Sequence, residues 1–261
     1  MGTFKSYYLT HSHVMELGKQ NKVELVNAYN SLERKPDEVK GYEVVNGKAI
    51  VSVDGVLVPS CSEWEEYWGY RSMAKIEKCL VTAMEDFTVN HVILDMDSPG
   101  GTVQATKPLA DFIKSMRGDK RITTFIRGQM CSGGVFIGTA ADEIFSDSET
   151  NIVGSIGVYM VHYDYSEWEA NLGVKATYIK AGRYKAAGNP DEPLSDDAKE
   201  MYQKLVDNDY RVFVESVADY RGVTVEEVVQ NWADAKLFSA SEAVSNGLID
   251  GIVSFNELIN D

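Results

Sequence analysis

The sequence predicts an α/β protein with repeated strand-turn-helix units, a mainly parallel sheet and right-handed crossovers. The first observation is that β-branched and aromatic runs of strand length alternate with longer segments whose apolar residues recur at helical spacing. The second is that two of these runs, residues 91–97 and 121–126, each end in a glycine-rich turn that leads directly into a helical pattern. Such turns place backbone N–H groups at the carboxyl edge of a parallel sheet.

The first half of the chain supplies the strongest element signals. Apolar runs on either side of Asn46-Gly47 predict a hairpin over residues 42–53. The aromatic and acidic stretch 60–70 is compatible with a lid, a partner contact or a covered loop. Further elements are expected as a helix over 71–86, a strand over 91–97, a helix over 103–116 and a strand over 121–126.

The second half predicts shorter strands and one long helix. We expect strands over 142–146, 175–180 and 248–253, a helix over 195–220 capped by Ser195, and helices over 223–232 and 239–246. The 261 residues, 44% of them hydrophobic, suffice for one or two domains. We divide them into an N-terminal helical extension, residues 1–40, and a main domain, residues 41–261.

Ser132 lies where a predicted strand turns into a predicted helix. A hydroxyl there stands beside unpaired helix N–H groups and the positive end of the helix dipole, which favour negative charge. The alternative is that Ser132 only caps the helix, as most serines before helices do. The N–H groups of Gly101 and Gly133, at the same sheet edge, could together form an oxyanion hole.

Four motifs resemble, in order, those of the signal peptide peptidase A family, and most closely its bacteriophage head-maturation branch. The resemblance covers roughly residues 42 to 253 and implies the Clp/crotonase fold. The motifs are Asp95-Met-Asp-Ser-Pro-Gly-Gly101, Cys131-Ser-Gly-Gly134, Val153-Gly-Ser-Ile-Gly-Val158 and Gly182-Arg-Tyr-Lys-Ala-Ala-Gly-Asn-Pro190.

The resemblance implies a serine endopeptidase with a Ser-Lys dyad, which needs no cofactor and no metal. Ser132 would be the nucleophile and Lys185 the general base. The other implied roles are oxyanion donors at Gly101 and Gly133, lysine positioning by Ser155, turn support and substrate binding at Gly100, and substrate binding at Gly154, Ile156 and Gly157.

A lysine can act as a base only when its surroundings lower its pKa from about 10.4 toward neutrality. A lysine in a Gly-Asn-Pro loop is ordinarily a solvated surface residue. The interval between Ser132 and Lys185 nevertheless matches the spacing in the family.

Other chemistries stay open at this stage. Cys131 could be proposed as a thiol nucleophile, and His162 with Asp164 could complete a Ser-His-Asp triad. A crotonase-like acyl-CoA enzyme and an inactive scaffold protein are further alternatives. The resemblance favours the dyad because Lys185 matches its motif and His162 matches none.

Composition narrows the partners. Asp and Glu number 40 against 25 Lys and Arg, a net charge of −15, which argues against nucleic acid and anionic membranes as partners because both require a positive surface. Three cysteines without metal-ligand spacing suggest a reducing compartment, and no signal peptide or apolar membrane span is visible. We therefore expect a protein of the host cytoplasm or procapsid that cleaves capsid and scaffold proteins, or else a cytosolic peptide-degrading relative.

The family also implies a homo-oligomer in which the Ser132 of one protomer is served by the Lys185 of a neighbour. A monomer whose own lysine folds back over Ser132 is the alternative, since a loop of that length closes at modest entropic cost.

Overall fold

The computed structural model describes residues 41–261, which form two compact units. The larger unit holds residues 41–157 and 211–261, and the smaller one holds residues 158–210. The predicted N-terminal helical extension lies outside the described residues. Among the described residues, no helix combines the length and the apolar composition that a membrane span requires.

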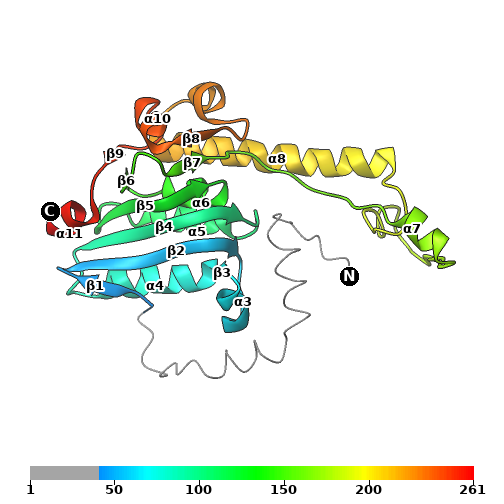
Figure 1. Ribbon diagram of the computed structural model, residues 1–261, viewed down its shortest axis with the longest axis horizontal. Coiled ribbons are helices and arrows are strands. Elements are labelled where there is room, and N and C mark those ends of the chain that lie inside the picture. The colour runs from blue at the N-terminus through cyan, green and yellow to red at the C-terminus, as the bar shows by residue number, and fades with distance from the viewer. Residues whose placement is uncertain (1–40) are drawn as a thin grey trace. The chain divides into compact units, whose positions relative to one another are not determined.

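The larger unit is built on a nine-stranded sheet with the order β1-β2-β4-β5-β6-β9, to which β3, β7 and β8 are joined at its margins (Figure 1). Within residues 41–261 only the pairs β1–β2 and β7–β8 are antiparallel, which confirms the predicted α/β class with a mainly parallel sheet. The strands are β1 (Glu43–Val45), β2 (Lys48–Val58), β3 (Tyr70–Ser72), β4 (His91–Gly101), β5 (Arg121–Cys131), β6 (Glu143–Ser146), β7 (Ile152–Gly154), β8 (Leu237–Ser239) and β9 (Gly251–Ile252).

Helices α4 (Met73–Glu85), α5 (Thr106–Ser115) and α6 (Gly133–Gly138) cover one face of this sheet (Figure 1). The apolar residues that repeat at helical spacing on α4 and α5 are buried. All six residues of α6 are buried, because this short helix lies in the interior behind β4 and β5. The helix after Ser132 is therefore fixed on all sides by the core.

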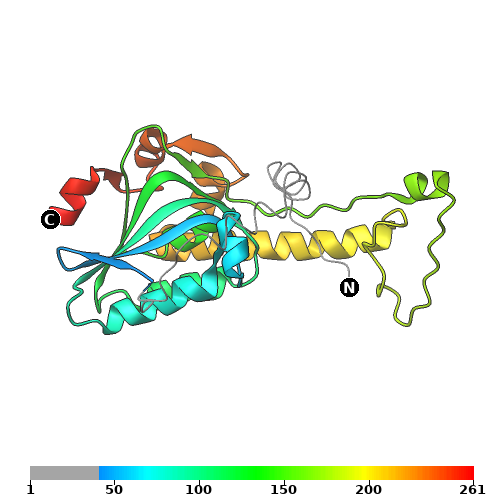
Figure 2. The same cartoon turned by 60° about the horizontal axis from the view of Figure 1, so that its bottom comes forward.

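The last helix, α11 (Phe255–Asn260), covers part of the opposite face, as the turned view shows (Figure 2). Leu258 and Phe255 pack against Phe125 and Ile93, which are fully buried. The Phe125 and Phe255 ring centroids are 5.5 Å apart. Sequence analysis did not predict α11, although Ser254 and Glu257 form a capping box at its start.

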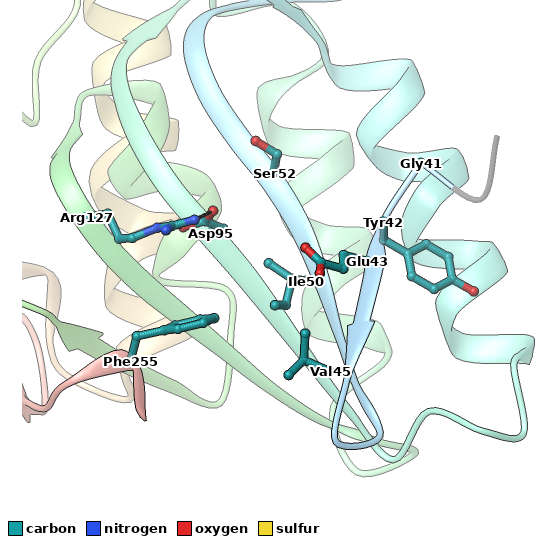
Figure 3. A pocket seen from close by; sticks show the side chains of 9 residues that line it. All are labelled: Gly41, Tyr42, Glu43, Val45, Ile50, Ser52, Asp95, Arg127 and Phe255. Carbon is teal, nitrogen blue, oxygen red and sulfur yellow. Dashed lines mark hydrogen bonds and ion pairs between the residues drawn. The ribbon is translucent and has the colours of Figure 1, made fainter. Parts of the chain in front are cut away.

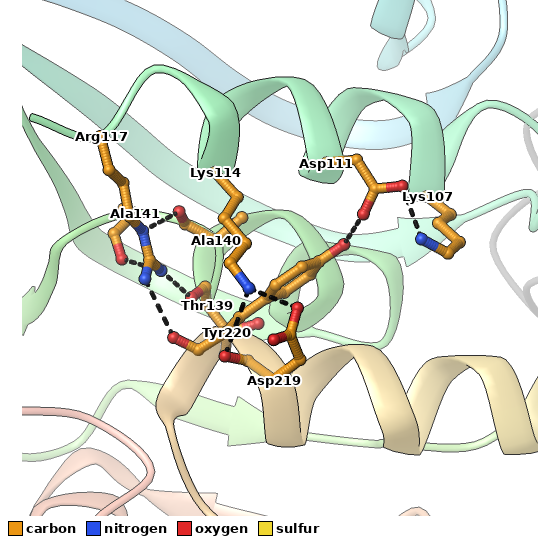
Figure 4. Close-up of polar contacts among 9 residues, drawn as sticks. All are labelled: Lys107, Asp111, Lys114, Arg117, Thr139, Ala140, Ala141, Asp219 and Tyr220. Carbon is orange, nitrogen blue, oxygen red and sulfur yellow. Dashed lines mark hydrogen bonds and ion pairs between the residues drawn. The ribbon is translucent and has the colours of Figure 1, made fainter. Parts of the chain in front are cut away.

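Arg117, directly after α5, ties three segments of the larger unit together (Figure 4). Its guanidinium donates to the carbonyl oxygens of Thr139, Ala140 and Ala141, where α6 ends, at 2.9, 2.8 and 2.5 Å. It also donates to the Tyr220 carbonyl at 3.1 Å. One side chain thus satisfies three carbonyls directly after α6 and one carbonyl in the last turn of α8.

Most predicted elements agree with the structure. The hairpin turns at Asn46 and Gly47, which have φ of 51° and 77°. The long helix is α8 (Asp196–Arg221), and Ser195 caps it through a bond from the Ala198 N–H to its hydroxyl oxygen. The remaining pieces are α9 (Val225–Glu227), the π-helix η1 (Val228–Trp232) and α10 (Ala240–Ser245).

Two regions differ from the prediction. Residues 59–72 contain a short helix, α3 (Glu63–Tyr67), and the strand β3, which pairs with the end of β2. The predicted strand over residues 175–180 is wrong, because this exposed segment has no regular structure and pairs with none of the strands in the described part of the chain. In the smaller unit the regular elements are α7 (Ser166–Asn171) and the first turns of α8.

Candidate active site

Ser132 ends strand β5 and begins helix α6 with a backbone conformation that few residues other than glycine adopt. Its φ is 51° and its ψ is −118°, and its side chain makes no capping hydrogen bond. The alternative that Ser132 merely caps the helix is therefore not supported. Its N–H instead donates to the Gly154 carbonyl at 2.9 Å, and the residue is only half-buried. A strained backbone that holds an unused hydroxyl at a surface is typical of functional sites.

Gly100 allows strand β4 to approach Ser132 closely. A Cβ atom on Gly100 would lie 2.7 Å from the Ser132 Cβ and 2.8 Å from the Gly133 nitrogen, and the φ of Gly100 is 97°. Any other residue would collide there and would also be strained. The Pro-Gly-Gly segment, predicted as a turn but in fact the end of β4, is thus in direct contact with the Ser-Gly-Gly turn.

Gly101 and Gly133 bring their backbones together in the same place. A Cβ on Gly133 would lie 3.4 Å from the Gly101 nitrogen, and one on Gly101 would overlap the Leu57 carbonyl oxygen. That carbonyl accepts from the Thr102 N–H at 2.9 Å. The N–H of Gly133 belongs to the first turn of α6 and has no partner within the helix. Two N–H groups beside the Ser132 hydroxyl could stabilise a developing oxyanion.

Ser98 holds the Pro-Gly-Gly segment in place, a role that sequence analysis missed. Its fully buried hydroxyl donates to the Gly55 carbonyl at 2.7 Å and accepts from the Gly100 N–H at 3.1 Å. A serine two residues before a glycine is a recognisable turn signal, since its hydroxyl can bond the backbone two positions ahead.

Ser155 follows the residue that binds the Ser132 backbone. It has a φ of 58°, and its N–H donates to the Lys236 carbonyl at 2.7 Å. The Ile156 carbonyl accepts from Ala235 at 3.0 Å, and the Ile156 side chain is fully buried. We predicted that the 154–157 segment binds substrate. In the structure the Ser155 N–H and the Ile156 carbonyl of this segment already form hydrogen bonds with residues 235–236.

In that segment, Gly154 and Gly157 both lie against the chain at residues 235–236. Gly154 has a φ of 128°, and a Cβ there would overlap the Lys236 carbonyl oxygen. A Cβ on Gly157 would lie 3.2 Å from the Ala235 Cβ. These glycines permit close backbone packing next to Ser132.

Lys185 belongs to the smaller unit, whereas Ser132, Ser155 and the predicted oxyanion glycines belong to the larger one. It lies in an irregular loop and its side chain is exposed. Its N–H donates to the Gly182 carbonyl at 3.2 Å. The structure thus brings the predicted nucleophile and the predicted oxyanion donors together within one unit, and the predicted base is carried by the other.

The alternative catalytic groups have other roles in the structure. The His162 ring donates from Nε2 to the Asn189 carbonyl at 2.8 Å. The Asp164 carboxylate accepts from the Ser166 N–H at 2.9 Å, and hydrogen bonding by Ser166 lowers the pKa of Asp164. Cys131 is buried, and desolvation raises its pKa to about 11, so its thiolate is scarce at neutral pH.

A separate pocket of about 500 Å³ opens on the sheet face that carries α11 (Figure 3). Arg127 and Asp95 form an ion pair at its wall, and the guanidinium carbon lies 5.5 Å from the centroid of the Phe255 ring. None of the predicted catalytic residues lines this pocket. Its lining residues are Gly41, Tyr42, Glu43, Val45, Ile50, Ser52, Asp95, Arg127 and Phe255.

Comparisons with known proteins agree with the motifs. The chain is 33% identical over 224 residues to capsid assembly protease C of Escherichia phage lambda, a match that covers 86% of this chain and 50% of that protein. It is 32% identical to the head-tail preconnector protein GP5 of Enterobacteria phage P21, covering 84% and 43%. It is 30% identical to protease 4 of Haemophilus influenzae, covering 93% and 38%. The chain therefore spans half or less of the length of these relatives.

Among solved structures, the chain is similar to a ClpP1 mutant from Listeria monocytogenes, with a TM-score of 0.46, 14% identity and coverage of 82% of this chain and 95% of that one. A model of peptidase family S49 matches residues 114–261, a range that contains Ser132, Ser155 and Lys185. The resemblance inferred from four motifs in order is thus confirmed. The chain belongs to peptidase family S49.

Proposed function

We propose that this protein is a serine endopeptidase in which Ser132 is the nucleophile and Lys185 the general base. The observation that carries the proposal is the conformation of Ser132. This half-buried residue does not cap helix α6 with its hydroxyl, and its strained backbone lies against Gly100 and Gly133. Membership of a peptidase family supports the same chemistry. A crotonase-like reaction needs no such serine and no lysine partner.

In the proposed mechanism the neutral amine of Lys185 takes the proton of the Ser132 hydroxyl while the oxygen attacks the scissile carbonyl carbon. The N–H groups of Gly101 and Gly133 bind the oxyanion that forms. The lysine then gives its proton to the leaving amine as the C–N bond breaks. Water hydrolyses the acyl-enzyme by the same steps, with Lys185 again accepting and returning a proton.

We propose capsid and scaffold proteins as substrates, in the host cytoplasm or the procapsid. Similarity to a capsid assembly protease and to a head-tail preconnector protein supports this choice. The second candidate is a peptide-degrading enzyme of the signal peptide peptidase A type, which the similarity to protease 4 favours.

We further propose a homo-oligomer that shares the dyad between protomers. Among residues 158–210 only one residue, Ala198, is buried, so this unit has no apolar core of its own. An exposed apolar surface of this kind is typical of a protein–protein interface. A second copy is the partner we propose, since this unit carries the predicted base. Its exposed large apolar residues are Tyr159, Met160, Val161, Tyr163, Tyr165, Trp168, Leu172, Val174, Tyr178, Ile179, Tyr184 and Leu205.

Substitution of the nucleophile tests the proposed activity. Ser132→Ala removes only the hydroxyl, so we expect hydrolysis of a peptide library to fall by about 10⁴-fold or more with an unchanged melting temperature. A fluorophosphonate probe should label Ser132 in the wild-type chain, as mapped by mass spectrometry. Ser245→Ala, at an exposed serine of α10, is the matched control and should keep full activity. Retained turnover in Ser132→Ala, lost again in Cys131→Ala, would move the nucleophile to Cys131.

A further inference from the structure

The loop that carries Lys185 has no helix or strand, and several hydrogen bonds hold its backbone. We call residues 182–192 the lysine loop. Of the five carbonyl groups from residue 186 to residue 190, four accept a hydrogen bond from a neighbouring donor within the smaller unit. The side chain of Lys185 is long and flexible, so the position of its amine depends on how firmly this backbone is held.

Three side chains supply most of these bonds. The Tyr202 hydroxyl on α8 donates to the Ala187 carbonyl at 2.8 Å. His162 donates to the Asn189 carbonyl at 2.8 Å, and because a carbonyl can only accept, the Nε2 atom must carry a hydrogen. The Asn189 amide donates to the Ala186 carbonyl at 2.7 Å.

Asn189 and the chain at Tyr165 complete the arrangement. The second acceptor of the Asn189 amide is the Glu192 carboxylate at 2.9 Å, while the Asn189 side-chain oxygen accepts from the Asp191 N–H at 2.9 Å. The Tyr165 N–H donates to the Pro190 carbonyl at 2.7 Å. The loop is therefore braced from within by Asn189 and fastened from two sides, by residues 162–165 and by α8.

We propose that His162, Asn189 and Tyr202 are positioning residues, which fix the lysine loop so that Lys185 reaches the Ser132 hydroxyl. This inference rests on the proposed function, because it requires Lys185 to be the base. It gives His162 a part in the reaction other than that of a triad histidine: it acts through the Asn189 backbone and exchanges no proton with Ser132. A loose loop would still let substrate bind but would place the amine correctly only part of the time.

The experiment measures kcat and KM separately for four variants. Tyr202→Phe, His162→Leu and Asn189→Ala each remove a donor, and we expect kcat to fall by about 10- to 100-fold with KM within about twofold of the wild-type value. His162→Gln keeps an N–H near the position of Nε2 and should recover most of kcat. The control is Lys204→Ala on the same helix as Tyr202, which removes only an exposed i,i+4 ion pair with Glu200 and should behave as wild type.

Oligomer size and melting temperature are recorded for every variant, and Tyr202→Phe, which loses a single oxygen atom, keeps the test valid if His162→Leu does not fold. Lys185→Ala distinguishes a failure of the positioning role from a failure of the proposed function. If Lys185→Ala is inactive while Tyr202→Phe, His162→Leu and Asn189→Ala all retain the wild-type kcat, the inference is overturned and the proposed function stands. If Lys185→Ala keeps full activity, the proposed function fails and the inference fails with it. Equal losses for His162→Gln and His162→Leu would also overturn the role given to the His162 donor.

Discussion

The surroundings of Ser132 and those of Lys185 are built in opposite ways. Ser132 lies against glycines whose neighbours leave no room for a side chain, and helix α6 behind it is buried throughout. Lys185 is exposed in a unit with one buried residue, and its loop depends on hydrogen bonds rather than on a core. The difference teaches that the protomer itself holds the proposed nucleophile and the proposed oxyanion donors in place, whereas the proposed base lies on an exposed unit for which we propose a second copy as partner.

Removing the proposed base, Lys185, gives the largest expected effect among the tests of this comparison. Lys185→Ala and Lys185→Arg should each lower kcat by about 10³-fold or more, because neither an alanine nor a permanently charged guanidinium can take the proton of Ser132. Steady-state hydrolysis of a peptide substrate measures this. Lys175→Ala, at another exposed lysine of the same unit, is the control and should keep wild-type activity. Substantial activity in Lys185→Arg would contradict the assigned role.

A methyl group at Gly100 tests the preorganised half of the comparison. Gly100→Ala should lower kcat by about 10²-fold, because the added carbon meets both Ser132 and the Gly133 nitrogen and disturbs the oxyanion donors. Gly118→Ala is a matched control, since Gly118 has a similar φ of 89° and open space around it. Both variants carry the same backbone strain, so kinetics that fall equally in the two would show that contact with Ser132 is not the cause.

Replacing Arg117 tests how much its hydrogen bonds stabilise the larger unit, which holds Ser132. Arg117→Ala leaves the carbonyls of Thr139, Ala140 and Ala141 without their donor, and we expect a loss of about 3 kcal/mol in the free energy of unfolding. Urea denaturation measures this loss. Lys107→Ala removes an exposed i,i+4 ion pair with Asp111 and should cost less than about 0.5 kcal/mol. Similar midpoints for the two variants would contradict the role given to Arg117.

His91 gives the smallest expected effect, a pH dependence of stability. Burial, together with the positive charges of Arg121 and Lys48, lowers its pKa to about 4. The unfolded chain therefore binds the proton more readily, and stability is lost as the pH falls from the ordinary value of 6.5 toward 4. Between pH 7 and pH 5 the wild-type protein should lose about 2 kcal/mol more than His91→Gln. Parallel pH profiles for the two proteins would show that His91 titrates normally.

Sequence patterns predicted those elements that have a clear local signal, either a periodic run of apolar residues or a characteristic turn. Strands β4 and β5, the hairpin at Asn46-Gly47 and the long helix α8 all follow from apolar periodicity or turn chemistry. The predicted strand over 175–180 is wrong because β-branched and aromatic residues favour a strand only where a neighbour can pair with it. Helix α3 and strand β3 are too short for a periodicity to appear.

The sequence predicted that the two glycine motifs meet at one edge of the sheet, but it did not predict the hydrogen bonds that support the candidate site. The glycine motifs are visible in the sequence, and their contact follows from the adjacency of parallel strand ends. The bonds to the lysine loop from His162 and Tyr202 join residues 15 to 27 positions apart, and no local pattern encodes them. The absence of a core in residues 158–210 was also invisible, because apolar residues there look like core residues until their exposure is known.

Subunit mixing tests the central claim most directly, namely that Ser132 and Lys185 act together and come from different protomers. Purified Ser132→Ala and Lys185→Ala chains are each expected to be inactive, and they are combined under conditions in which labelled subunits exchange. The account predicts that activity returns with the time course of exchange, because mixed assemblies contain sites with an intact Ser132 and a neighbour's intact Lys185. Mixtures that exchange subunits and yet stay inactive would contradict it.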